Sequence, residues 1–231
     1  MSGREAFKIK GVVRVHNAIL CVWSGLMLAG VIWQIFGVSA PQTGFYNDKG
    51  VMCDPGSKLY SKGSLLSYVT YSYYLSKFYE LLDTVIIVLK KRPLTFLQTF
   101  HHVSVMYLVW SWMDSGYTQS WVGVALNTCV HVFMYYYFSV ATFGHRPWWR
   151  RHLTSGQLLQ FTTVFFNIWW WLFFTGGDTL DKLNWHKNTN RCGGAAWSPV
   201  FSQMVNIAFL FLFGWFYVEN YMGKKSKPKA A

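Results

Sequence analysis

Residues 18–38 read AILCVWSGLMLAGVIWQIFGV and contain no acidic, basic or histidine side chain. An α-helix of this length covers the ~30 Å hydrocarbon layer of a membrane. Five more runs are mostly apolar and of similar length, at residues 64–89, 95–113, 118–142, 155–175 and 198–222. The sequence therefore predicts an all-α fold, a polytopic membrane bundle of six spanning helices, with residues 1–231 forming a single domain.

The composition supports this prediction. Aromatic residues make up 20% of the chain and charged residues only 13%, whereas soluble domains have a charged fraction of ~25%. The alternative is a large soluble helical protein with buried core helices.

The first run begins well into the chain and has no clear small-residue cleavage site, so we expect it to be retained and not removed as a signal peptide.

The net charge of +12 is unevenly distributed between the loops. If successive loops alternate between the two sides of a membrane, fourteen basic residues lie on the side of both termini and six on the other. The positive-inside rule then predicts cytosolic termini, including a basic tail at 223–231. The short basic groups next to the spans give no support to nucleic-acid binding, although they suit anionic headgroups or an anionic co-substrate.

Two cysteines lie in the long loops on the other side, Cys53 in 39–63 and Cys192 in 176–197. In an oxidising lumen they can pair, whereas Cys21 and Cys129 lie inside spans. We expect a Cys53–Cys192 disulfide, with two free thiols as the alternative. Lys227 and Lys229 resemble the dilysine-type retrieval signal of endoplasmic reticulum membrane proteins, although such a run is also found in ordinary solvated tails.

Polar side chains recur on one face of four successive spans. An ionisable group at membrane depth costs at least ~2.5 kcal/mol on insertion scales, so such groups usually face a bundle interior and mark a functional site. At 100° per residue each of the following sets falls on one helical stripe. The sets are Lys77, Glu80 and Asp83; Gln98, His101 and His102; Asn127, His131, Met134 and Tyr135; and Thr154, Gln157 and Gln160.

We expect these stripes to converge on a polar chamber near the cytosolic face. The alternative is that they hold the bundle together through interhelical hydrogen bonds, which contribute ~0.6 kcal/mol per pair. Packing alone does not require three charges and three imidazoles. In this chamber Glu80 or Asp83 can orient an imidazole, while Lys77 can hold an anionic substrate group or offset the burial of the acids.

The histidines argue against a redox metal. Membrane di-iron enzymes need about eight clustered imidazoles, and this chain has seven histidines in all. We expect only His101, His102 and His131 at membrane depth, and His16, His145, His152 and His186 at span edges or in loops. Gln98 stands where a third clustered histidine would be needed. The sequence therefore predicts metal-free chemistry by imidazoles, which can act as general base or as nucleophile toward an activated acyl group.

Four ordered motifs resemble the signatures of the ELO family of fatty-acid elongases. They are Lys77-x-x-Glu80-x-x-Asp83-Thr84, Gln98-x-x-His101-His102, Asn127-x-x-x-His131-x-x-Met134-Tyr135-x-Tyr137, and Thr154-x-x-Gln157-x-x-Gln160. Most animal and fungal members have histidine where this chain has Gln98. In this respect the second motif resembles that of elongases from algae and protists that extend polyunsaturated chains. The resemblance implies a 3-oxoacyl-CoA synthase of the endoplasmic reticulum that joins acyl-CoA, here of C18–C20 polyunsaturated type, to malonyl-CoA.

The resemblance also implies roles for the residues. His101 would form an acyl-imidazole, and His102 and His131 would transfer protons and stabilise charge. Substrate and CoA would be bound by Lys77, Glu80, Asp83, Gln98, Asn127, Tyr135, Gln157 and Gln160. Basic residues of the cytosolic side would also help to bind CoA. They are Lys90, Lys91, Arg92, Arg146, Arg150 and Arg151. The resemblance implies no bound cofactor. The acyl chain would lie in an aromatic tunnel that is closed toward the lumen. A disulfide would join the two lumenal loops.

The partners implied are acyl-CoA, malonyl-CoA, the lipid bilayer, the reductases and dehydratase of the elongation cycle, and a second copy in a homodimer. Family members usually have seven spans, and this sequence would begin just before the second. Either the sequence is truncated or this member lacks the first span. The alternatives to an elongase are a di-iron desaturase or hydroxylase, and a lipid or proton transporter, although no internal repeat of the kind found in transporters is evident.

Overall fold

A computed structural model describes residues 5–46, 50–55, 57–145, 147–176, 184–187 and 192–222. Within these ranges there is no β-strand, so the predicted all-α fold is confirmed. The long helices in them are α1 (Lys10–Ile32), α3 (Leu65–Leu89), α4 (Phe96–Ser115), α5 (Ser120–Ala141), α6 (Arg150–Gly176) and α7 (Trp197–Tyr217). Helix α1 continues through a π-helical segment, Trp33–Ser39, into the short α2 (Ala40–Thr43). Helix α7 continues into a second π-helical segment, Val218–Met222, and a 3-10 turn covers Lys58–Tyr60.

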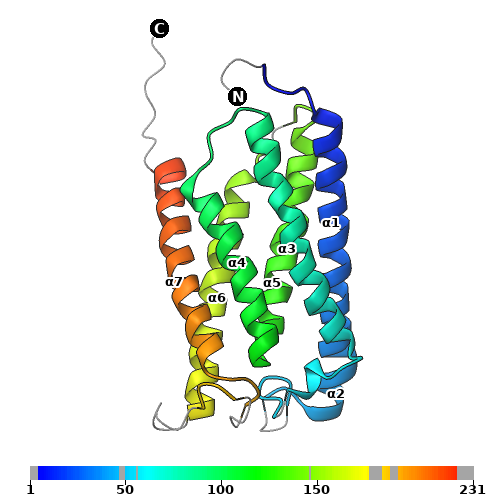
Figure 1. Ribbon diagram of the computed structural model, residues 1–231, viewed down its shortest axis with the longest axis vertical. Helices are drawn as coiled ribbons and strands as arrows, with labels where there is room; N and C mark the ends of the chain where they lie inside the picture. The colour runs from blue at the N-terminus through cyan, green and yellow to red at the C-terminus, as the bar shows by residue number, and fades with distance from the viewer. Residues whose placement is uncertain are drawn as a thin grey trace.

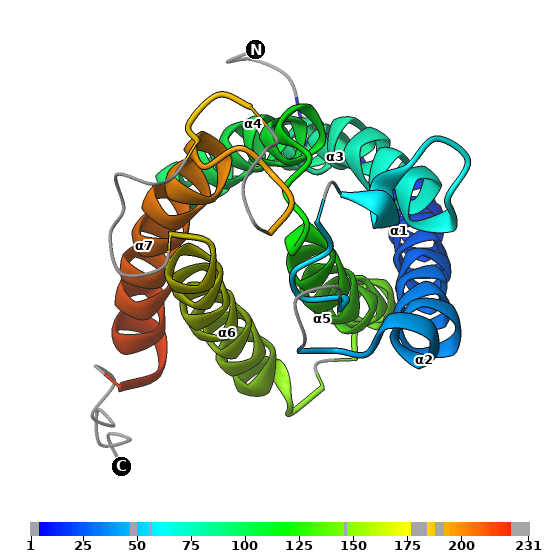
Figure 2. The ribbon, with the colours of Figure 1, turned by 90° about the horizontal axis from the view of Figure 1, so that it is seen from below.

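The long helices run alternately up and down and form a closed ring (Figures 1 and 2). Around this ring α1 packs on α3, α3 on α4, α4 on α7, α7 on α6, α6 on α5, and α5 back on α1. The chain order and the spatial order therefore differ, because α5 and α6 lie between α1 and α7. The ring brings the four polar stripes of α3, α4, α5 and α6 around one interior.

Four helical stretches are long and apolar enough to cross a membrane, Lys10–Thr43, Ser120–Ala141, Arg150–Thr175 and Trp197–Met222. Helices α3 and α4 have 25 and 20 residues but are more polar, because they carry two of the predicted stripes. Large apolar side chains are exposed on the bundle, including Leu26 (69%), Phe173 (74%) and Phe211 (70%). Lipid is the solvent that suits such a surface, and the chain is a multi-pass membrane protein.

Local capping sets the ends of α3 and α4. The Ser64 hydroxyl accepts a hydrogen bond from the Ser67 backbone N–H at 3.1 Å, and the Thr95 hydroxyl accepts one from the Gln98 N–H at 3.3 Å. Helix α4 ends at Ser115 and is capped by Gly116, whose φ of 65° lies in the left-handed region that favours glycine. The cap at Thr95 fixes the start of α4 just before Gln98, His101 and His102.

Two helices begin before the apolar runs that predict them. The first helix begins at Lys10, not at 18, and α6 begins at Arg150, not at 155. In both cases basic and polar residues lower the local hydropathy, yet they continue the helix beyond its apolar run. The remaining predicted bounds agree with the structure within two residues. Arg146 and the tail at 223–231, which includes Lys227 and Lys229, lie outside the described residues.

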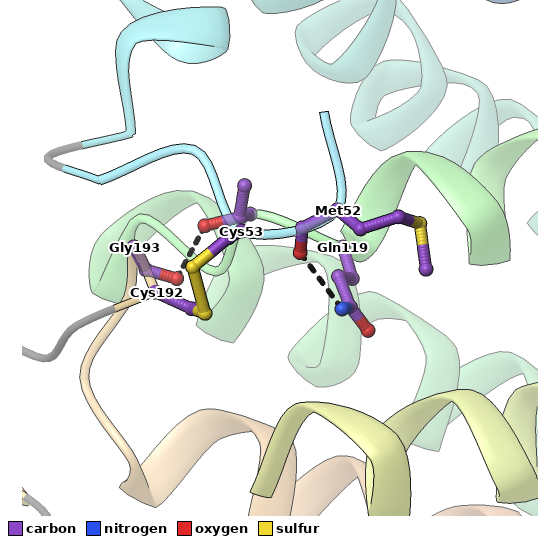
Figure 3. The surroundings of a disulfide bond; sticks show 6 residues. Met52, Cys53, Gln119, Cys192 and Gly193 are labelled. Atoms are coloured by element: carbon purple, nitrogen blue, oxygen red, sulfur yellow. Dashed lines mark hydrogen bonds between the residues drawn. A yellow bond between two sulfur atoms is a disulfide. The ribbon is translucent and has the colours of Figure 1, made fainter. Parts of the chain in front are cut away.

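The loops before α3 and α7 meet at the end of the bundle away from the termini (Figure 1). There Cys53 and Cys192 form a disulfide, the pair that the sequence leads us to expect (Figure 3). The Gly193 N–H donates to the Cys53 carbonyl at 2.8 Å, and the Gln119 amide donates to the Met52 carbonyl at 2.8 Å. A Cβ on Gly193 would lie 2.6 Å from the Asp54 carbonyl oxygen, so only glycine fits this close approach.

Candidate active site

A cavity of about 690 Å³ occupies the interior of the ring. This volume falls in the range of ~300–1,000 Å³ found for small-molecule sites. Exposed residues at the end near the termini line it, including Lys10, Arg92 and Arg150, so the cavity reaches the surface there. Its lining also includes the buried Asn127 and Gln160 in the middle of α5 and α6.

The cavity collects nearly all of the predicted site residues. The members that line it are Glu80, Asp83, Gln98, His101, His102, Asn127, His131, Tyr135, Gln157 and Gln160. They come from α3, α4, α5 and α6, the four helices that carry the polar stripes. Lys77 does not line the cavity.

Lys77 lies behind the cavity wall, where it is 2% exposed. Its Nζ atom is 2.8 Å from Glu80 Oε1 and 3.1 Å from Asn127 Oδ1, and it lies 4.2 Å from the centre of the Tyr73 ring. The Tyr73 hydroxyl also donates to Asn127 Oδ1, at 2.7 Å. Lys77 therefore fixes the Glu80 and Asn127 side chains that reach the cavity. Two roles were expected for Lys77, namely to hold an anionic substrate group or to offset the burial of the acids. The observed geometry fits the second role better, because Lys77 contacts Glu80 and does not line the cavity.

His131 is held between Glu80 and Tyr135. Its Nδ1 atom is 3.5 Å from Glu80 Oε1, and its ring packs edge-on against Tyr135 with the ring centres 5.4 Å apart. A carboxylate beside Nδ1 favours the tautomer that carries the proton on that nitrogen. His131 Nε2 is then left as a hydrogen-bond acceptor that can take up a proton.

His101 and His102 are consecutive on α4, with ring centres 5.5 Å apart. The His101 ring packs against Phe209 at 5.3 Å and Phe213 at 6.3 Å, both from α7. Within the described part of the chain neither imidazole makes a side-chain hydrogen bond, and both line the cavity. Their ring nitrogens are therefore available to a bound molecule, while the phenylalanines fix the His101 ring.

The mouth of the cavity is positively charged. Lys10, Lys90, Arg92 and Arg150 line it. Partial burial, together with the charges of Arg92 and Lys10, lowers the pKa of Lys90, as expected where cations gather. Two other residues expected at this site do not line the cavity, Lys91 and Arg151. The mouth is suited to an anionic group such as a phosphate.

The fifth predicted span contributes the side of the cavity formed by α6. Gln160 is 7% exposed. The Gln157 amide nitrogen lies 4.0 Å from Met134 Sδ, a weak contact between α6 and α5. The Thr154 hydroxyl lies 3.5 Å from the Tyr221 hydroxyl, which belongs to the π-helical segment after α7.

Helix α1 adds two residues that the polar stripes do not include. Asn17 lines the cavity, and His16 lies beside it with 4% exposure. His16 lies just before the first apolar run, but α1 begins six residues before it, so both residues belong to the helix. The buried residues of α1 are Val13, His16, Asn17, Leu20, Ser24, Met27 and Val31. Their spacing of three and four residues is helical, and extending the first run toward the N-terminus on this spacing would have found both residues.

Among the described residues no group of three or more His, Cys, Asp or Glu side chains is arranged to hold a metal ion. The imidazoles of the cavity are instead paired with carboxylates or aromatic rings.

Comparison with known proteins gives a consistent result over the whole chain. The profile of the ELO family, described as the GNS1/SUR4 family, matches residues 1–229. A candidate fatty acid elongase of Dictyostelium discoideum is 37% identical over 231 residues, which are 100% of this chain and 72% of that protein. Fatty acid elongase A of the same organism is 34% identical over 99% of this chain and 79% of its own length. Very long chain fatty acid elongase 2 of Rattus norvegicus is 28% identical over 99% of this chain and 75% of its own length.

Proposed function

The chain belongs to the GNS1/SUR4 family of fatty acid elongases, and from this premise we propose that it is the condensing enzyme of fatty acid elongation. In this reaction a long-chain acyl-CoA and malonyl-CoA give 3-oxoacyl-CoA, CO2 and free CoA. One observation carries the proposal. Three imidazoles, those of His101, His102 and His131, line one cavity that has a basic mouth.

The two ends of an acyl-CoA match the two parts of this cavity. The phosphates of CoA are anionic and suit the mouth, where Lys10, Lys90, Arg92 and Arg150 lie. The acyl chain is apolar and suits the walls, which include Val13, Ile87, Leu97, Val130 and Phe161. The thioester that joins the two parts of the substrate would then lie near the imidazoles.

The first proposed step is transfer of the acyl group to His101. A ring nitrogen of His101 attacks the thioester carbonyl carbon, the C–S bond breaks, and CoA leaves as a thiolate that takes up a proton. The packing of this ring against Phe209 and Phe213 supports the role, because it limits the orientations of the attacking nitrogen. The step needs no bound cofactor.

The second proposed step forms the carbon–carbon bond. Malonyl-CoA loses CO2, and the resulting carbanion attacks the acyl carbon while the C–N bond to His101 breaks. His102 and His131 would stabilise the negative charge that develops and return protons. For His131 this role is supported by Glu80, which lies 3.5 Å from Nδ1 and leaves Nε2 as the nitrogen that can take up a proton.

The same proposal assigns the membrane orientation and the substrate preference. Basic residues gather at the mouth, so by the positive-inside rule this end and both termini would face the cytosol, with the disulfide-linked loops in the lumen of the endoplasmic reticulum. Glutamine at position 98 favours C18–C20 polyunsaturated acyl chains. The 3-oxo product would pass to the reductases and dehydratase of the elongation cycle.

The test uses the purified chain, residues 1–231, in lipid nanodiscs with acyl-CoA and radiolabelled malonyl-CoA. We expect label in a product two carbons longer, and no product above background from His101→Ala. His152→Ala is the matched control, because His152 is exposed on α6 and does not line the cavity. Wild-type protein without malonyl-CoA-dependent elongation, or His101→Ala with full activity, would contradict the proposal.

The substrate preference is tested separately in a yeast host that expresses the chain and is fed a panel of fatty acids. Chain-length analysis of the lipids should show the largest gain for polyunsaturated C18 and C20 acids. An equal gain for saturated acids would contradict the assignment made from Gln98.

A further inference from the structure

His16 makes a contact with the candidate site that the four motifs do not explain. Its Nε2 atom is 2.9 Å from Asp83 Oδ1, and the other oxygen of the same carboxylate, Oδ2, accepts a hydrogen bond from the Tyr135 hydroxyl at 2.8 Å. The contact joins α1 to α3, and Tyr135 continues it to α5. Asp83 and Tyr135 line the cavity, whereas His16 does not.

Through Asp83 and Tyr135, the contact connects His16 to the imidazole of His131. The Tyr135 ring packs edge-on against His131, and its hydroxyl is anchored on Asp83. The His16 ring is itself fixed by stacking on Tyr79, with ring centres 5.2 Å apart. A rigid donor on α1 thus holds the carboxylate, the carboxylate holds the tyrosine, and the tyrosine bounds the space that His131 can occupy.

The other nitrogen of His16 shows that packing alone does not account for this residue. His16 is 4% exposed, and its Nδ1 atom is buried without a hydrogen-bond partner among the described residues. A buried polar atom without a partner is destabilising. A phenylalanine would fill a similar volume and leave no such atom, so the imidazole is retained at a cost to stability.

We infer that His16 is a positioning residue for the proposed condensation, acting through Asp83 and Tyr135 on the placement of His131. The inference rests on the proposed function. His16 Nε2–H donates to Asp83 Oδ1, which directs Oδ2 toward the Tyr135 hydroxyl and keeps that ring against the His131 imidazole. His16 touches neither substrate nor reacting atoms.

This role predicts a particular kinetic signature. A hydrogen bond to a charged group corresponds to a factor of about 10 to 100, so His16→Phe is expected to lower kcat by about that factor. Because His16 does not line the cavity, KM for acyl-CoA should change by less than about threefold. His16→Gln keeps a donor near the position of Nε2 and should recover most of the rate.

A double-mutant cycle separates this role from a general loss of structure. In an Asp83→Asn background the carboxylate is gone, so adding His16→Phe should lower kcat by less than about twofold. Tyr135→Phe provides a second background in which the effect of His16→Phe should also shrink. Elution volume and unfolding temperature, measured for each purified variant in nanodiscs, identify any that fails to fold, and His152→Phe is the matched control.

The outcomes are distinguishable. The inference is overturned if His16→Phe retains the wild-type kcat, if it costs the full factor in the Asp83→Asn background as well, or if His16→Gln is as slow as His16→Phe. If the wild-type chain shows no malonyl-CoA-dependent elongation, the proposed function fails instead. A wild-type chain that elongates, with His16→Phe slowed in kcat alone and rescued by glutamine, supports the inference.

Discussion

Replacing Lys77 by methionine tests how the buried charges beside the cavity are stabilised. Lys77 and Glu80 are 2% and 1% exposed, and the Nζ–Oε1 distance is 2.8 Å. Methionine keeps most of the side-chain volume but removes the cation, which leaves the Glu80 carboxylate without its closest partner. Asn127 loses a donor in the same change, because its Oδ1 atom is 3.1 Å from Nζ.

The magnitude follows from the burial of both partners. Removing one member of a buried ion pair costs about 3–5 kcal/mol, because the remaining charge is left uncompensated. For a chain of this size each kcal/mol corresponds to roughly 2–4 °C in the unfolding temperature. Lys77→Met should therefore lower the unfolding temperature by roughly 6–20 °C.

The measurement is thermal unfolding of the purified protein in detergent micelles, followed by tryptophan fluorescence. The matched control is Lys62→Met, the same chemical change at an exposed position in the loop before α3, which should shift the midpoint by no more than about 2 °C. The double variant Lys77→Met/Glu80→Gln removes both charges. Its loss of stability should be smaller than the sum of the two single losses by about 1–3 kcal/mol.

Two results would refute the reasoning. One is a Lys77→Met midpoint equal to that of Lys62→Met, which would mean that leaving the Glu80 carboxylate without its cation has no cost. The other is strict additivity of the two single changes, because coupled charges cannot behave as independent sites.

Two further predictions concern the end of the bundle away from the termini. Reducing the Cys53–Cys192 disulfide, which spans 139 residues of sequence, should cost about 5 kcal/mol in the chain-entropy account; an unfolding temperature unchanged by reductant would contradict this. Gly123→Ala would place a Cβ 2.8 Å from the Trp112 ring, so we expect a loss of about 1–3 kcal/mol. Gly214→Ala, with nothing within 4 Å, is its control, and equal unfolding temperatures for the two variants would exclude the proposed clash.

Helical spacing was enough to place most of the predicted site residues at the cavity. Glu80 and Asp83, three residues apart on α3, both line it, because residues three or four apart lie on one face of a helix. The same spacing could not distinguish side chains that line the cavity from side chains that pack behind its wall. Lys77 lies on that face as well, but it turns toward Asn127 of α5 and packs behind the wall, and which side chain reaches a neighbouring helix depends on how that helix is placed.

The part contributed by α1 could not be predicted from hydropathy. Lys10 and Arg14 lower the apolar character of the first turns, so the apolar run starts after His16 and Asn17. Both side chains are nevertheless buried, because α1 packs between α3 and α5 in the ring. The contact between His16 and Asp83 is part of the packing of α1 against α3.

The most direct test of the central claim is to look for the acyl group on His101. The purified chain is incubated with acyl-CoA in the absence of malonyl-CoA, then digested and analysed by mass spectrometry. We predict that the peptide containing His101 gains the mass of the acyl group, that adding malonyl-CoA removes it, and that His101→Ala never acquires it. A chain that elongates acyl-CoA while this peptide stays unmodified, or that carries the acyl group on another residue, would contradict the account.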